Sequence, residues 1–400
     1  MNAFDHELSQ RLASIREQEL YRELRRIDSP QSPRIEVDGK PMLNFSSNDY
    51  LGLANHPALK QAAIEAIEKY GVGAGASRLV CGSLAPHHEL EEALASFKGA
   101  EAALTFSTGY AAALGTISAL LGKDDIIVID KLVHACIVDA ARLCGAKMRV
   151  FGHNDLNELE TILQWAANRS ANNTNPGRIL IVTESIFSMD GDAAPLREIV
   201  SLKEKYGAWL MLDEAHATGL YGANRRGLAE KCRVEDCIEI QMGTLGKALG
   251  ASGGYICGSR KLIDYLINRA RTFIFSTAPI PAAAAAATAG IQFVESATGE
   301  ERRKVLWQRV SEVGSKFETH LSRTHSAIVP IVIGNELKAV QAAAVLRAQS
   351  LFVPAIRYPT VPRGTARLRV TLTAAHTEAD VESLLKALQV LNLEAELLKS

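Results

Sequence analysis

Between residues 57 and 257 the chain alternates between short apolar runs and stretches with helical periodicity, and this alternation limits the possible folds more than any other feature. Short apolar runs bounded by turn residues are typical of buried strands, and strands that alternate with helices indicate a mostly parallel, helix-covered sheet. The expected strands are 102–106, 125–130, 147–151, 178–184, 208–213, 238–243 and 253–257. The expected helices are 57–70, 86–97, 109–121, 134–143, 155–168 and 195–205. The sequence therefore predicts an α/β domain.

The residues before this pattern predict two smaller elements. Residues 5–26 carry the charged, amphipathic pattern of a surface helix. The segment Val37-Asp38-Gly39-Lys40 predicts a tight hairpin turn between strands at 34–37 and 42–45, because Asp-Gly is a favoured pair at the centre of such a turn.

The pattern changes again after Pro279 and Pro281, where longer helices replace the alternation. Four hundred residues exceed the ~250–300 at which a single core stops growing, so we expect more than one domain. The expected C-terminal elements are helices near 281–297 and 301–322, strands near 327–333 and 366–373, and a final helix. The predicted parts are an N-terminal helix and hairpin segment over 1–54, a large α/β domain over 55–279 and a smaller C-terminal α+β domain over 280–400.

Composition argues against several classes of partner. The chain has 44 Lys and Arg against 45 Asp and Glu, so nothing indicates a nucleic acid or an acidic membrane surface. Charges throughout residues 1–20 argue against a signal peptide, and the longest apolar run, Ile280–Ile291, is too short to cross a bilayer. Six cysteines without a C-x-x-C pair are typical of buried thiols in a reducing compartment, not of a metal site. We expect a soluble, cytoplasmic protein.

Two segments point to cofactor chemistry. Asp213 closes the apolar run 208–212, and Lys247 follows in the glycine-containing loop Thr244–Lys247. In open α/β sheets, ligands bind beyond the carboxyl ends of the strands. A lysine there is a candidate Schiff-base nucleophile, and an aspartate that holds a pyridinium nitrogen is the partner that pyridoxal 5'-phosphate (PLP) requires. The sequence therefore predicts a PLP site.

Other residues at predicted strand ends supply the remaining contacts that PLP needs. His216, three residues after Asp213, can reach the phenolic oxygen of the ring. Ser107-Thr108-Gly109-Tyr110 opens a helix whose amides can cradle the phosphate, and Thr244 can add a hydroxyl. His134 begins another helix and is the candidate to stack on the ring.

Competing motifs lack the context that they need. Gly71–Ala76 matches the dinucleotide pattern G-x-G-x-x-A but follows a helical segment, whereas that fingerprint follows a strand. Gly250–Gly254 matches G-x-S-x-G but leads into a strand, whereas the hydrolase elbow leads into a helix. Ser188 precedes Asp213 and His216 in hydrolase order, so an acyltransferase without PLP, built on Ser188 or Ser252, is an alternative.

The chain resembles the α-oxoamine synthases, PLP enzymes that condense an amino acid with an acyl thioester and release carbon dioxide. The segments that carry the resemblance are 44–53, 183–192, 213–216, 243–247, 326–328, 355–362 and 364–376. Together they cover nearly the whole chain, and 364–376 is the most specific of them. The resemblance implies a fold-type I PLP-dependent transferase.

The resemblance also implies roles for individual residues. Lys247 is implied to bind PLP covalently and to act as the general base, with Asp213 and His216 as ring partners. His134 is implied to stack on the ring and also to contact the substrate. The other implied roles are cofactor support for Ser188 and Thr244, the phosphate for Gly109 and Tyr110, the amino acid carboxylate for Asn48 and Arg369, and the acyl substrate for Arg22 and Thr360. Arg25 and Arg26 lie close to Arg22 and are alternatives to it.

The C-terminal segments most resemble the branch of this family that uses L-alanine and a pimeloyl thioester, carried on coenzyme A or on acyl carrier protein. Family members are homodimers with sites at the subunit interface, so a homodimer is implied. A sister synthase that uses glycine or serine is the alternative, because one methyl group is worth only ~1–3 kcal/mol in an apolar pocket.

Overall fold

The computed structural model describes residues 2–171, 177–316 and 326–397. The chain forms two compact units, one of Leu51–Ser188 with Asp192–Arg303, the other of Met1–Tyr50, Met189–Gly191 and Lys304–Ser400. The three-part division with boundaries after residues 54 and 279 stays a prediction. Residues 317–322 of the predicted helix 301–322 lie outside the described residues.

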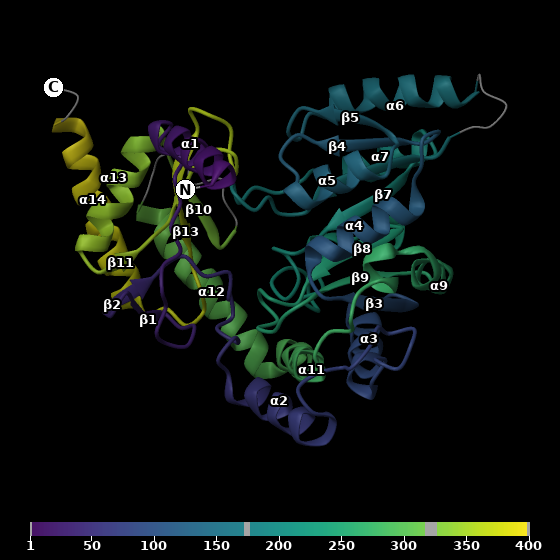
Figure 1. Cartoon of the computed structure of the whole chain (residues 1–400), viewed down its shortest axis with the longest axis horizontal. Coiled ribbons are helices and arrows are strands. Elements are labelled where there is room, and N and C mark those ends of the chain that lie inside the picture. Colours follow the sequence, from purple (N-terminus) through teal and green to yellow (C-terminus); the bar gives the residue numbers. More distant parts are fainter. Residues whose placement is uncertain (1, 172–176, 317–325, 398–400) are drawn as a thin grey trace. The chain divides into compact units, whose positions relative to one another are not determined.

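The larger unit is built on a seven-stranded sheet, in the order β3-β9-β8-β7-β6-β4-β5 (Figure 1). Its strands are β3 Ala102–Phe106, β4 Ile126–Asp130, β5 Lys147–Phe151, β6 Ile179–Glu184, β7 Trp209–Asp213, β8 Ile240–Thr244 and β9 Gly254–Gly258. Strands β5, β4, β6, β7 and β8 are parallel, whereas β9 runs antiparallel to both β8 and β3. All seven predicted strands are confirmed within two residues.

Helices of the larger unit connect and cover these strands. They are α2 Pro57–Tyr70, α3 Ala85–Lys98, α4 Gly109–Leu120, α5 Ala135–Leu143, α6 Leu156–Ala171, α7 Leu196–Lys205, α8 Leu228–Cys232, η1 Glu235–Cys237, α9 Arg260–Arg269, α10 Arg271–Ile274 and α11 Pro281–Glu295. Helix α12, Ala297–Lys316, begins in this unit and ends in the other. The six helices predicted between residues 57 and 205 are confirmed.

The core between the sheet and helices α4, α5 and α9 explains why these elements form. Ile129 and Val182 of the sheet pack with Ile117, Ile137 and Leu266 of the helices, and all five are buried. Burying an aliphatic side chain of this size contributes about 1.5–3 kcal/mol. The periodic apolar positions that predict the elements are therefore the ones that hold the sheet together.

In the smaller unit the predicted hairpin is confirmed. Strands β1 Arg34–Val37 and β2 Lys40–Asn44 pair antiparallel, and β11 Leu351–Phe352 adds to β2 in parallel. Asp38 and Gly39 both have positive φ angles, 50° and 75°, as a two-residue turn of this kind requires.

A second sheet of the smaller unit contains β10 Ile328–Gly334, β13 Ala366–Thr371 and β12 Ala355–Ile356, all antiparallel. Helices α13 Glu336–Ala348 and α14 Glu378–Leu397 complete it. The two predicted strands near 327–333 and 366–373 are confirmed. No helix in the described part of the chain is both long and apolar enough to cross a bilayer.

The prediction of one helix over residues 5–26 was wrong. Helix α1 spans Ala3–Glu17, and Glu19 takes a left-handed conformation with φ 59°. Beyond it the backbone bonds to the hairpin instead, because Ile27 bridges to Val37 and the Asp38 N–H donates to the Arg26 carbonyl. This pairing outweighs the helical periodicity of residues 18–26.

Candidate functional site

Strands β6 and β7 end side by side, each on a buried acid. Glu184 is the register partner of Asp213, and their residues are only 2% and 6% exposed. The Ser185 N–H donates to the Asp213 carbonyl at 2.9 Å, and the Asp213 carboxylate accepts from the Ala215 N–H at 2.9 Å. The parallel register therefore brings two carboxyl groups together at the carboxyl edge of the sheet.

Lys247 and His134 lie close enough to this acid pair for their charges to shift its protonation. Burial raises the pKa of Asp213, while the nearby Lys247 and His134 pull that pKa down. His134 keeps an exposed face, yet desolvation of the rest of its ring lowers its pKa against the opposing pull of Asp213. The structure thus brings together three of the predicted catalytic residues, from three different strand ends.

The loop that carries Lys247 is short and closed. It leaves β8 at Thr244 and returns through β9 at Gly254, and these two residues are register partners. Within the loop the Leu245 N–H donates to Gly253 at 2.9 Å, and the Gly250 N–H donates to the Lys247 carbonyl at 2.9 Å. Backbone hydrogen bonds therefore fix the loop on both sides of the lysine.

Glu184 belongs to this cluster, although sequence reasoning did not place it in the site. One of its oxygens accepts from the Ser188 N–H at 3.2 Å, and the other is buried with no hydrogen-bond partner among the described residues. Burial and the nearby Asp213 raise the pKa of Glu184 well above its usual value. Burial and the neighbouring acid favour the protonated form, while Lys247 and the Ser188 N–H favour the carboxylate. The signal was available, since Glu184 closes an apolar run as Asp213 does.

Beside the cluster, the first turn of α4 meets Thr244. Thr108 caps this helix by accepting from the Ala111 N–H at 3.0 Å, and a Cβ on Gly109 would come within 2.6 Å of the Thr244 methyl carbon. The Thr244 hydroxyl is buried without a partner in the described part of the chain. A buried hydroxyl beside helix N–H groups fits an anionic group such as a phosphate.

The other predicted cofactor contacts occupy the loops around this edge. His216 and Ser188 are 6% and 8% exposed, on the segments that follow β7 and β6. Tyr110 is 44% exposed, and its hydroxyl donates to the Asp139 carboxylate at 2.5 Å. His216 and Ser188 therefore lie on the loops that follow Asp213 and Glu184. Tyr110 lies at the surface, between α4 and α5.

Four of the five predicted substrate residues lie in the smaller unit, and the fifth, His134, lies in the larger one. Arg22 donates to the Tyr358 carbonyl at 3.1 Å and lies 3.5 Å from the Thr360 hydroxyl. Arg25 instead binds Asp38 at 3.1 Å, and Arg26 binds Asp28 at 2.5 Å. Of the three candidate arginines, only Arg22 meets the other predicted acyl-substrate residue in this structure.

Arg369 and Asn48 have polar neighbours of their own in the smaller unit. Arg369 is 4% exposed and donates to the Thr371 hydroxyl at 3.0 Å. The Asn48 side-chain oxygen accepts from the Tyr50 hydroxyl at 3.4 Å. The buried guanidinium and the amide are both able to bind a carboxylate.

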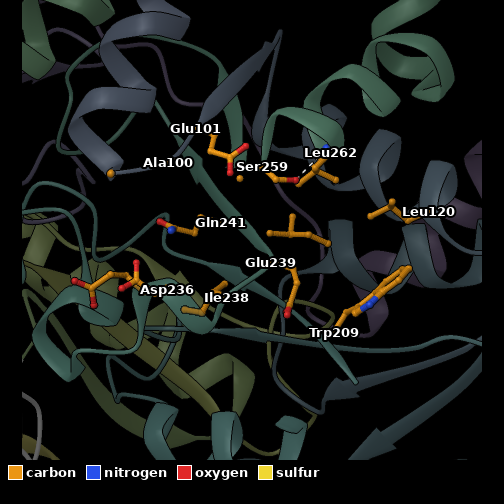
Figure 2. A pocket seen from close by; sticks show the side chains of 14 residues that line it. Ala100, Glu101, Leu120, Trp209, Asp236, Ile238, Glu239, Gln241, Ser259 and Leu262 are labelled. Carbon is orange, nitrogen blue, oxygen red and sulfur yellow. Dashed lines mark hydrogen bonds between the residues drawn. The ribbon is translucent and has the colours of Figure 1, made fainter. Parts of the chain in front are cut away.

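A separate hollow of ≈ 450 Å³ lies at the opposite edge of the sheet (Figure 2). Trp209 and Ile240, the first residues of β7 and β8, line it together with Glu101, Glu239 and Gln241. The predicted catalytic residues follow the other ends of these strands, so this hollow is not their site.

The structure around the two competing motifs differs from the structure that each motif needs. Gly71–Ala76 follows helix α2, not a strand. Gly250–Gly254 leads into strand β9, not into a helix. Neither a dinucleotide fingerprint nor a hydrolase elbow is formed at these positions.

Comparison with known proteins adds to this geometry. Residues 40–388 match the family model of aminotransferase class I and II. The chain is 46% identical over 391 residues to an 8-amino-7-oxononanoate synthase from Geotalea daltonii, with 97% of each chain covered. It is 48% identical over 384 residues to one from Geobacter sulfurreducens, with 94% of this chain and 95% of that one covered. The chain belongs to the 8-amino-7-oxononanoate synthase family.

Solved structures agree with membership of the 8-amino-7-oxononanoate synthase family. Serine palmitoyltransferase from S. paucimobilis, with a bound PLP–myriocin aldimine, matches 99% of this chain with a TM-score of 0.90 at 28% identity. The 8-amino-7-oxononanoate synthase from Francisella tularensis matches 90% of this chain with a TM-score of 0.75 at 28% identity. The predicted fold-type I transferase architecture is confirmed. The fold is shared with a serine palmitoyltransferase, so membership of this family rests on sequence identity.

Proposed function

We propose that the protein condenses L-alanine with a pimeloyl thioester to give 8-amino-7-oxononanoate, carbon dioxide and the free thiol carrier, a step of biotin biosynthesis. The observation that carries the proposal is the near full-length identity to relatives named for that product. The buried acid and the adjacent lysine at the sheet edge support PLP as the cofactor.

PLP, when bound, supplies an electron sink for the charge that develops on the α-carbon of the amino acid. Asp213 would accept the hydrogen bond of the protonated ring nitrogen, because its carboxylate is buried and can become anionic opposite a cation. Lys247 would attach the cofactor covalently and, once displaced by the amino acid, remove the α-proton as general base. General base catalysis supplies typically 10²–10⁴-fold, about 3–5 kcal/mol.

The remaining residues would orient the cofactor. His134 would cover one face of the ring, while His216 would address the phenolic oxygen. The phosphate would lie at the first turn of α4, at Gly109 and Tyr110, where Thr244 offers its buried hydroxyl. Ser188 would support the ring from the segment after β6. A phosphate at the first turn of α4 would meet the positive end of that helix's dipole.

Substrate binding would use the smaller unit. Asn48 and the buried guanidinium of Arg369 would hold the carboxylate of alanine. Arg22 and Thr360, which already lie together, would bind the distal carboxylate of the pimeloyl chain. A buried carboxylate without such partners would be costly, which gives the pair a role in selecting a dicarboxylic acyl chain.

We also propose a cytoplasmic homodimer. Two loops of the larger unit, 72–80 and 275–280, are tied together by the bridge between Ser77 and Thr277. They expose large apolar side chains, with Val72 73%, Val80 77% and Phe275 71% exposed. Large apolar side chains exposed on neighbouring loops support a protein–protein interface there.

The test is mass spectrometry of the product made by purified, PLP-loaded protein from L-alanine and pimeloyl-CoA. An 8-amino-7-oxononanoate peak with free coenzyme A supports the proposal, and parallel reactions with glycine, L-serine and pimeloyl-acyl carrier protein define the substrates. Lys247→Ala is the control, because it should abolish both the product and the visible absorbance of attached cofactor. If product formed only with glycine or only with L-serine, that amino acid would be the substrate in place of alanine.

A further inference from the structure

His153, two residues beyond the end of β5, lies between two carboxylates. Its Nδ1 is 3.1 Å from an oxygen of Asp130, and its Nε2 is 2.7 Å from an oxygen of Asp192. The Asp130 side chain is fully buried, and the His153 side chain is 25% exposed. Ionised carboxylates only accept hydrogen bonds, so a ring between two of them carries a proton on each nitrogen. An imidazolium is therefore the form that satisfies both contacts.

Asp130 connects this ring to the turn that leads to His134. It is the last residue of β4, and its carboxylate accepts from the Leu132 N–H at 2.7 Å and from the Asn154 N–H at 2.9 Å. The Leu132 bond fixes the turn immediately before α5, whose N-cap is His134. One carboxylate thus links the histidine ring to the candidate ring-stacking residue.

Asp192 connects the ring to the hairpin that carries Ser188. The hairpin is closed by the bridge between Ile186 and Ala193 and by the bond from the Phe187 N–H to the Asp192 carbonyl at 3.0 Å. The Phe187 ring meets the His153 ring edge-on, with 4.3 Å between their centroids. His153 therefore contacts both strands of this hairpin.

We propose that His153 is a positioning residue, which as an imidazolium holds the His134 turn and the Ser188 hairpin in place around the cofactor. This inference rests on the proposed function, because His134 and Ser188 are proposed cofactor contacts. The charged groups that face the ring are Asp130, from β4, and Asp192, from the hairpin. Phe187 also contacts the ring, and the Asn154 amide nitrogen, 3.3 Å from Nε2, donates to Asp192 at 3.1 Å. Without the cation, two carboxylates would face each other across the gap.

The electrostatics agree with this arrangement. Burial alone would lower the pKa of His153, but the hydrogen bonds to Asp130 and Asp192 outweigh it and raise the pKa to about 10. An imidazolium with that pKa keeps its proton throughout the neutral range, where an ordinary histidine loses it. The contact is therefore constant, not switched, at neutral pH.

The direct test is ¹⁵N NMR of the holoenzyme labelled at histidine, with the His153 signal assigned by its loss in His153→Gln. We expect the His153 ring to keep the ¹⁵N shifts of a doubly protonated imidazole up to pH 8.5. The exposed His6 in the same spectra serves as an internal reference. A neutral His153 ring at pH 7 would overturn the proposal. This readout does not depend on which product the enzyme makes.

The functional test compares His153→Gln and Asp192→Asn with Asp236→Asn, an equal charge change at an exposed residue by the far hollow. Since ~1 Å of misplacement can cost about 10²-fold, we expect kcat to fall by about that factor in His153→Gln, with a weaker Kd for PLP. In Asp192→Asn the Kd for PLP should weaken as pH rises from 6 to 8.5, and it should not in the wild type or the control.

A merely structural role would lower the Tm of both variants without giving Asp192→Asn this pH dependence. An unchanged pH profile, or kcat and PLP affinity within about twofold of the wild type in His153→Gln, would overturn the positioning role. Failure of the proposed function looks different: the wild-type protein itself would bind no PLP or form no 8-amino-7-oxononanoate.

Discussion

The guanidinium of Arg22 lies 3.5 Å from the hydroxyl of Thr360, a residue 338 positions further along the chain. The same guanidinium donates to the carbonyl of Tyr358 at 3.1 Å. A cation and a hydroxyl brought together in this way offer a carboxylate two partners at once. Arg25 and Arg26 are occupied by aspartates, so the three neighbouring arginines are not equivalent.

Arg22→Ala should discriminate between acyl chains with and without a distal carboxylate. Hydrogen bonds to charged groups are worth about 1.5–3 kcal/mol, so kcat/KM for pimeloyl-CoA should fall about 10–100-fold. The value for octanoyl-CoA, which lacks that carboxylate, should change little. Arg25→Ala is the matched control, because its guanidinium binds Asp38. Equal losses on both thioesters would remove the proposed carboxylate role.

Asp213→Asn should bind PLP and yet turn over slowly. An amide cannot stabilise a protonated ring nitrogen as a carboxylate does, so we expect kcat to fall by on the order of 10²–10³-fold. Lys247 and the α4 turn would still hold the cofactor, and its visible absorbance should remain. Asp264→Asn, an exposed aspartate on α9, controls for the loss of charge. Near wild-type turnover in Asp213→Asn would show that the ring-nitrogen assignment is wrong.

Glu184→Gln should gain stability relative to the wild type as pH rises. The pKa of Glu184 is raised in the folded protein, so its contribution is fully present below the unfolded pKa and is lost as pH rises through the folded one. Glutamine never ionises and avoids this loss. Between the unfolded and the folded pKa of Glu184, the difference in unfolding free energy should grow by up to about 1.4 kcal/mol per pH unit.

Urea unfolding at matched protein concentrations measures this difference, and Glu68→Gln on the exposed side of α2 is the control. Because the amide keeps the size of the protonated acid and an oxygen that can accept from the Ser188 N–H, kcat should stay within a few-fold of the wild type. A difference that shrinks with pH, or a Glu184→Gln enzyme without activity, would mean that Glu184 is ionised.

Lys98→Met should destabilise the larger unit strongly. The Lys98 ammonium binds the Glu214 carboxylate at 2.5 Å, and both side chains are 1% exposed. Glu214 also accepts from the Ala229 N–H at 3.0 Å. Removing one partner of a buried pair costs about 3–5 kcal/mol, because the other charge is left uncompensated.

Thermal and urea unfolding test this, and Lys98→Met combined with Glu214→Gln should recover part of the loss. Lys69→Met on the exposed face of α2 is the matched control. If the double variant were as unstable as the sum of its single changes, the two side chains would not be coupled.

Local pattern was enough to predict the sheet of the larger unit. Strands β3, β4 and β6 are buried along their whole length and β7 along all but its first residue, so their ends could be read directly, and Asp213 could be placed at one of them. The same reasoning would have placed Glu184 at a strand end, but not beside Asp213, because neither segment shows which strands are neighbours in the sheet.

Distant contacts explain what the sequence could not predict. Helix α1 ends at Glu17 because the next residues pair with a hairpin that forms further along the chain. Arg22 differs from Arg25 because it contacts residues more than three hundred positions away. His153 has one carboxylate from the end of β4 and one from the hairpin after β6. Periodicity describes neighbours along the chain and carries no information about such partners.

The antiparallel return of β9 has a mechanical consequence for Lys247. A parallel connection would continue through a helix to the other end of the sheet. Here a short loop joins the end of β8 directly to the start of β9, between the paired residues Thr244 and Gly254. Hydrogen bonds on both sides of Lys247 thus fix its backbone, which does not move as a lid does. The Lys247 amine can therefore move between binding the cofactor and removing a proton only by rotation about the bonds of its four methylene groups. The length of that side chain limits how far apart these two positions can be.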